Sequence, residues 1–128
     1  MTSPGRAALL RELGKFVMEH LRDRALSHAE RTLAGQWAAP ATQRLQSELA
    51  QLSPEQRALV FRVVRASVDS AIHDFLFALT ELERANSVAM TVQGVDATTL
   101  SDGVYAEQGG ADGWQASYSR YGEAPEED

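Results

Sequence analysis

The stretch "LSPEQRALVFRVVRASVDSAIHDFLFALTELER", residues 52–84, decides the fold of this chain. Its beginning carries two helix-start signals. Ser53 and Gln56 have the spacing of a capping box, and Pro54 stands where proline is favoured, at the first helical position. No other proline and no glycine follow up to residue 84. The stretch therefore predicts one uninterrupted helix over residues 54–84.

Apolar side chains recur along this helix at intervals of three and four residues, as on one helical face. The main stripe consists of Val60, Val64, Ser67, Ala71, Phe75, Ala78 and Leu82. A second set widens it: Leu59, Val63, Ile72, Leu76 and Leu79. An apolar sector of this width is typical of a central helix that packs against several neighbours.

Two more helices are expected before it. Residues 4–33 carry an apolar stripe (Leu10, Leu13, Val17, Leu21, Ala25 and Ala29), and Gly35 follows as a stop signal. Residues 41–51 predict a short helix with leucines along one edge. We therefore expect an N-terminal antiparallel bundle of three helices, two long and one short.

The pattern changes after residue 86, where short β-rich runs alternate with turn residues. We expect strands at about 88–92, 95–100, 104–107 and 114–120, and Gln93-Gly94 between the first two fits a primed hairpin turn. In the last run Trp114, Ala116 and Tyr118 alternate with polar residues, which predicts one buried face. The fold class is thus α+β, with a small antiparallel meander packed on the helices of a single domain, residues 1–122. The acidic tail, 123–128, is expected to be disordered.

Composition excludes several classes of site. The 128 residues include no cysteine, so disulfides, thiolate catalysis and cysteine-based zinc sites are excluded. No apolar run approaches the roughly 20 residues that span a bilayer, and the first residues lack the apolar core of a signal peptide. We therefore expect a cytoplasmic protein without a membrane partner.

The negative charge is concentrated in the C-terminal third. Residues 1–85 carry 11 Lys/Arg and 10 Asp/Glu, a net of +1, whereas residues 86–128 carry one and eight, a net of −7. An acidic field repels phosphate and attracts basic partners. The split argues against nucleic-acid binding and favours a basic protein partner.

Few residues suggest chemistry. Asp69 and His73 share a helix face at a spacing of four, but no recognised zinc pattern accompanies them. The chain contains no G-x-S-x-G nucleophile motif and no glycine-rich phosphate loop that opens a helix. We therefore expect no metal and no cofactor, and the sequence favours a non-enzymatic role.

The functional prediction is a small interaction protein whose acidic C-terminal β-region docks a basic partner, with an adaptor or a toxin-immunity role as examples. The candidate partner-binding residues are Asp102, Tyr105, Glu107, Asp112 and Tyr121. The alternative is a small enzyme or ligand-binding domain with a cleft between helices and sheet. The long helices overhang a compact monomer of this size, so we also expect a homodimer.

Overall fold

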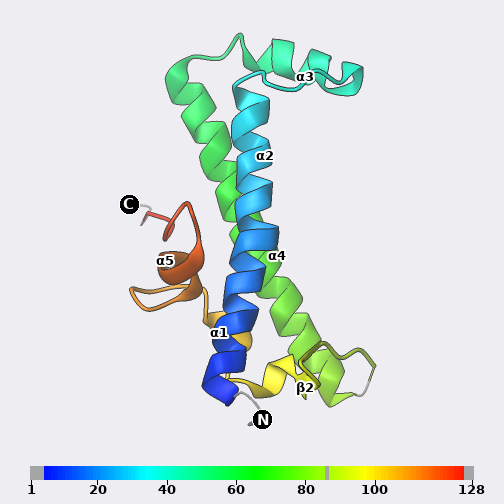
Figure 1. Ribbon diagram of the computed structural model, residues 1–128. Coiled ribbons are helices and arrows are strands. Elements are labelled where there is room, and N and C mark those ends of the chain that lie inside the picture. The colour runs from blue at the N-terminus through cyan, green and yellow to red at the C-terminus, as the bar shows by residue number, and fades with distance from the viewer. Residues whose placement is uncertain (1–4, 86, 126–128) are drawn as a thin grey trace.

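The computed structural model describes residues 5–85 and 87–125. A helical hairpin forms the body of the molecule (Figure 1). Its first arm is a continuous rod made of α1 (Arg6–Val17), η1 (Met18–Arg22) and α2 (Asp23–Leu33). Its second arm, α4 (Pro54–Arg84), runs back antiparallel to the first, and α3 (Pro40–Leu49) lies across the end where the arms are joined.

The long second arm forms as the sequence predicts. The backbone N–H of Ser53 donates to Oε1 of Gln56 at 2.8 Å, and the N–H of Gln56 donates to Oγ of Ser53 at 3.1 Å. These reciprocal bonds are the capping box, which satisfies two backbone donors that a helix start leaves unpaired. The helix then continues for 31 residues.

The first arm contains a π-helical segment that the sequence analysis did not predict. A π turn holds more residues than an α turn, so it rotates the following side chains relative to the preceding face. Leu13 and Val17 are buried as expected, but beyond them the buried positions are Met18, Arg22, Leu26 and Thr32. The expected stripe through Leu21, Ala25 and Ala29 is therefore displaced, and Leu21 is exposed.

The core lies between the two arms and uses one part of the wide apolar sector of α4. The buried residues of α4 are Ile72, Leu76 and Leu79, which belong to the second, widening set. In the main predicted stripe, Phe75 and Leu82 are exposed. Only part of the wide apolar sector is therefore buried in the C-terminal half of this helix.

The expected four-strand meander is reduced to one short hairpin. Strands β1 (Thr91–Val92) and β2 (Val95–Asp96) pair antiparallel, with Val92 opposite Val95. Gln93 and Gly94 have φ angles of 48° and 83°, which confirms the primed turn. The first two predicted strands, 88–92 and 95–100, are therefore shorter than expected, and η2 (Ala97–Thr99) replaces the end of the second.

The strands predicted at 104–107 and 114–120 are wrong. The first is a 3-10 turn, η3 (Val104–Ala106), packed on α4, and the second is a short helix, α5 (Trp114–Tyr118), beside α1 and η1. Trp114 is buried as expected, but Ala116 is exposed and Gln115 is buried, because a helix does not alternate faces as a strand does.

The Trp114 side chain packs against the first arm at Gly14. A Cβ atom at residue 14 would lie 2.6 Å from Cδ1 of the indole, so only glycine leaves room for the ring. The fold is therefore mostly helical with a small two-stranded antiparallel sheet, which is consistent with the α+β class. Within the described ranges, no helix is both long and apolar enough to cross a membrane.

The predicted disordered tail falls partly on residues 126–128, which lie outside the described residues. The part of the tail that is described makes specific contacts. The backbone N–H of Gly110 donates to Oε1 of Glu123 at 3.0 Å, and the N–H of Ala124 donates to Oε1 of Gln115 at 3.4 Å. Residues 123 and 124 are thus held against the segment around α5.

Candidate functional site

The most elaborate polar arrangement of the molecule is centred on Arg22, the last residue of η1. Its side chain is 0% exposed, and the π-helical turn directs it between the two arms. Nε donates to Oδ1 of Asp69 at 2.7 Å, and Nη2 donates to Oδ2 at 3.2 Å. This two-pronged ion pair joins the first arm to the middle of α4, since a guanidinium matches both oxygens of a carboxylate.

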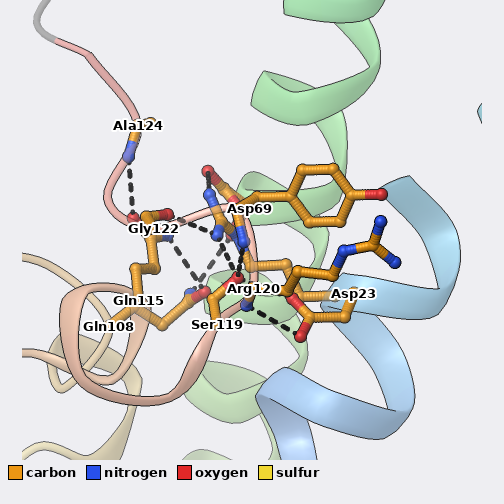
Figure 2. A network of polar contacts seen from close by, with 10 residues as sticks. Asp23, Asp69, Gln108, Gln115, Ser119, Arg120, Gly122 and Ala124 are labelled. Carbon is orange, nitrogen blue, oxygen red and sulfur yellow. Dashed lines mark hydrogen bonds and ion pairs between the residues drawn. The ribbon is translucent and has the colours of Figure 1, made fainter. Parts of the chain in front are cut away.

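The same guanidinium binds the C-terminal part of the chain (Figure 2). Nη1 donates to Oγ of Ser119 at 2.7 Å and to the backbone oxygen of Gly122, also at 2.7 Å. Asp23 completes the arrangement: Oδ1 accepts from the Ser119 hydroxyl at 2.6 Å, and Oδ2 accepts from the backbone N–H of Arg120 at 2.9 Å.

A second layer of contacts surrounds these bonds. Nε2 of Gln108 donates to the backbone oxygen of Asp69 at 3.3 Å. The backbone N–H groups of Trp114 and Gln115 donate to the oxygens of Glu107 and Gln108 at 2.9 and 3.1 Å. We call the contacts of Arg22, Asp23 and Asp69 with residues 108–122 the latch. Every polar side chain at its centre is paired, so the latch is suited to holding the fold together.

A polar cleft of about 400 Å³ lies outside the latch, next to Asp23. Its lining includes three arginines, Arg24, Arg31 and Arg120, together with His28 and Trp37. The Arg31 guanidinium lies 4.0 Å from the centre of the Trp37 ring. Arginines can bind an anion, whereas the Trp37 face attracts the Arg31 cation, and the carboxylates of Glu19 and Asp23 also line the cleft.

Two of the predicted partner-binding residues lie close together on the C-terminal half of α4. The ring of Tyr105 meets the rings of Phe77 and His73 edge-on, with centroids 5.1 and 5.5 Å apart. Asp102 precedes Gly103, against which the Tyr105 ring folds. We call His73, Phe77 and Tyr105 the aromatic trio.

The other predicted residues lie elsewhere. Tyr121 packs on Phe61, with ring centroids 6.1 Å apart, and Phe61 precedes Phe77 by 16 residues, or about 24 Å along α4. Glu107 is half-buried, and Asp112 is exposed in the loop before α5. Tyr105 and Tyr121 therefore pack on different parts of α4.

Asp69 and His73 do not act as a pair. Asp69 binds Arg22, whereas Nδ1 of His73 lies 3.2 Å from Oδ1 of its neighbour Asp74. Across residues 5–85 and 87–125, no group of three or more histidine and carboxylate side chains is placed to hold a metal ion.

An apolar groove runs along the face of the hairpin where α1 and η1 meet α4. A cavity of about 290 Å³ lies in it. Phe16 and Leu21 line it from the first arm and Phe75 from the second, and Met90 also contributes. Phe16 is 62% exposed and Phe75 is 57% exposed, so large apolar rings lie in contact with water.

Sequence reasoning missed the latch because its central residue looks like an ordinary surface arginine. Arg22 stands between Leu21 and Asp23, and regular α-helical spacing would place Leu21 inside. Only one signal was present: Ser119 and Gly122 stand at the end of the last predicted strand, and Glu123 follows them. That signal does not identify a partner 97 residues earlier in the chain.

Comparison with family models gives one match: residues 12–107 match a family of unknown function, DUF6547. The match covers most of the chain, and the protein belongs to this family. The matched range contains Arg22, Asp69, the aromatic trio and the lining of the apolar groove, and it ends before α5. The curated proteins and the solved structures give no match.

Proposed function

We propose that this member of a family of unknown function is a non-enzymatic interaction protein, and that it docks a basic segment of a protein partner on the aromatic trio. One observation carries the proposal. Three rings with centroid separations of 5.1 to 6.4 Å are held half-exposed beside the exposed carboxylate of Asp74, and the exposed Asp102 precedes Tyr105 by three residues in the chain.

The trio is suited to binding because its rings are ordered before a partner arrives. Each ring packs against the other two, and η3, which carries Tyr105, is packed on α4. Ordered rings lose little conformational freedom on binding, and a lysine or arginine side chain gains cation–π attraction over an aromatic face. His73 is 50% exposed and Phe77 45% exposed, so both rings are accessible.

Charge supports a basic partner. The carboxylate of Asp74 is adjacent to the trio in the sequence and 76% exposed. The described residues 87–125, which carry Tyr105, have one Lys/Arg and five Asp/Glu, a net charge of −4. A negative field speeds the approach of a basic protein, and screening beyond about 8 Å at physiological salt weakens it.

A titration monitored by NMR tests this proposal. The probe is a peptide of alternating serine with lysine and arginine, and the control peptide replaces each basic residue by glutamate. Amide shifts should appear at residues 73–77 and 102–106 with the basic peptide only, and they should weaken as salt rises. Shifts elsewhere, or equal shifts with the acidic peptide, contradict the proposal.

Variants of exposed carboxylates show which surface binds the peptide. Asp74→Asn combined with Asp102→Asn should weaken peptide binding several-fold, because the combination removes both carboxylates and keeps the rings. Asp112→Asn is the matched control, since it removes one exposed carboxylate from the loop before α5. If Asp112→Asn has the larger effect, the binding surface is that loop and not the trio.

The polar cleft supports a second candidate function, the binding of a small anion. The observation behind it is that three arginines, Arg24, Arg31 and Arg120, line one cleft and outnumber its two carboxylates, Glu19 and Asp23. Isothermal titration with inorganic phosphate and with citrate tests it. Arg31→Gln should reduce the affinity at least tenfold if the cleft binds either anion, and absence of binding at millimolar anion rejects this candidate.

A further inference from the structure

The apolar groove is the largest feature that the proposed function leaves unexplained. Its floor is made by core residues of both arms, and its walls are exposed phenylalanine and leucine side chains. A second cavity of about 260 Å³, lined by Leu13, Phe16 and Met90 among others, extends it toward β1. We propose that a second copy of this chain covers the groove, with the two α4 helices antiparallel about a two-fold axis near Ala71.

The exposed area is large enough for an interface. Phe16 and Phe75 each expose more than half of their surface, or about 100 Å² per ring. Leu21 and Leu82 are also exposed, so the apolar surface of this face amounts to a few hundred Å². Continuous apolar patches of this size usually mark an interface, and a stable dimer buries about 800 Å² on each partner, including the polar rim.

The spacing of residues on α4 favours a second copy over an unrelated partner. Its outer stripe has the positions 60, 64, 67, 71, 75, 78 and 82, separated by 4, 3, 4, 4, 3 and 4 residues. The order of intervals is the same in both directions from Ala71. An antiparallel copy centred there therefore presents an identical row, as a two-fold interface requires.

The side chains that this pairing brings together are complementary in size. With the axis at residue 71, two residues lie opposite each other when their numbers add to 142. Phe75 of one copy therefore lies opposite Ser67 of the other. Leu82 pairs with Val60 in the same way, and Ala71 pairs with itself. The small residues at 67 and 71 let the helices approach closely, which leaves room for the phenylalanine ring.

The distribution of charge along α4 favours an antiparallel arrangement of the two α4 helices. Residues 54–66 carry three arginines and one glutamate, a net of +2. Residues 67–82 carry three carboxylates and no Lys/Arg, and because Asp69 is paired with Arg22 of the same chain, this half keeps a net of −2. Antiparallel pairing places the basic half of each helix beside the acidic half of the other, whereas parallel pairing places like charges together. Two helical hairpins joined in this way form a four-helix arrangement, which buries a face that one hairpin leaves open.

Light scattering after size exclusion tests the dimer. The unmodified chain at 50 μM should give a mass near 28 kDa, twice the 14.0 kDa of one chain. Phe75→Asp should shift the mass to that of the monomer, with helicity checked by circular dichroism. Leu59→Asp, the matched control, changes an exposed apolar residue about 100° around the helix from Val60, and it should stay dimeric. A monomeric unmodified chain, or a dimer unaffected by Phe75→Asp, overturns the proposal.

Cysteine cross-linking tests the axis, since the chain has no cysteine of its own. Cα atoms joined by a disulfide lie about 4.4–6.8 Å apart, so Ala71→Cys should oxidise to a covalent dimer if the axis passes beside residue 71. Ser70→Cys, at an exposed position about 100° around α4 from Ala71, should remain monomeric under denaturing electrophoresis. Cross-linking that is equal at both positions overturns the antiparallel arrangement. The mass and the cross-link need no basic peptide, so they are independent of the trio.

Discussion

Replacement of Arg22 by alanine should destabilise the protein more than any change at a surface arginine. The guanidinium makes four hydrogen bonds, two with Asp69, one with Ser119 and one with Gly122. The variant leaves the Asp69 carboxylate without its cation while that side chain is only 18% exposed. Breaking a buried ion pair on one side costs about 3–5 kcal/mol, and the partial exposure of Asp69 places the expected loss near about 3 kcal/mol.

Urea unfolding followed by far-UV circular dichroism measures this loss, at one fixed protein concentration because an oligomer links stability to concentration. Arg44→Ala is the control. Arg44 is 92% exposed and faces only Glu48 on its own helix at 3.5 Å, so its removal should leave the midpoint unchanged. The double variant Arg22→Met with Asp69→Leu should lose less than Arg22→Ala, since it leaves no unpaired carboxylate.

Hydrogen exchange shows which part of the chain loses stability when Arg22 is replaced. The Arg22 side chain is bound to residues 119 and 122, so amide protection in Arg22→Ala should fall first between residues 114 and 124. Amides in the middle of α4 should lose protection only with global unfolding. A loss below about 1 kcal/mol, or unchanged protection at 114–124, would refute the view that Arg22 holds the C-terminal segment.

Three further changes have distinct expected outcomes. Gly14→Ala should lower the thermal midpoint by several degrees, because its Cβ would overlap the Trp114 indole; an unchanged midpoint would mean that the ring is not seated there. Ser53→Ala should cost about 1 kcal/mol in urea unfolding, since it removes the side-chain acceptor for the N–H of Gln56, and Ser53→Asp should restore most of it. Tyr121→Phe should leave stability equal or slightly higher, because the buried hydroxyl has no hydrogen-bond partner among the described residues; a loss above about 1 kcal/mol would reveal one.

Local features of the fold could be predicted from the sequence. The limits of α4 followed from Ser53, Pro54 and the absence of later breakers, and the primed turn followed from Gln93-Gly94. These features depend on the backbone preferences and short-range bonds of a few adjacent residues, so the residues that determine them are also adjacent in the sequence. The burial of Trp114 was predicted as well, although from the alternation of a strand that the structure replaces by a helix.

The candidate sites depended on contacts between distant parts of the chain. The spacing of apolar residues did not show which part of the wide apolar sector of α4 meets the first arm, because Phe75 and Ile72 both fit helical spacing. The π-helical turn then decided that Arg22, and not Leu21, points inward.

The C-terminal segment shows why the other features of the fold could not be predicted without the tertiary structure. Residues 114–118 alternate as a strand would, yet they form a helix, because Trp114 fits beside Gly14, and Ser119 and Gly122 bind Arg22. Those partners lie about 100 residues earlier in the sequence. The sequence by itself determined where the long helices begin and end, through short-range backbone chemistry. The tertiary structure decided which faces are buried and which are left open, because burial depends on partners that no local pattern identifies.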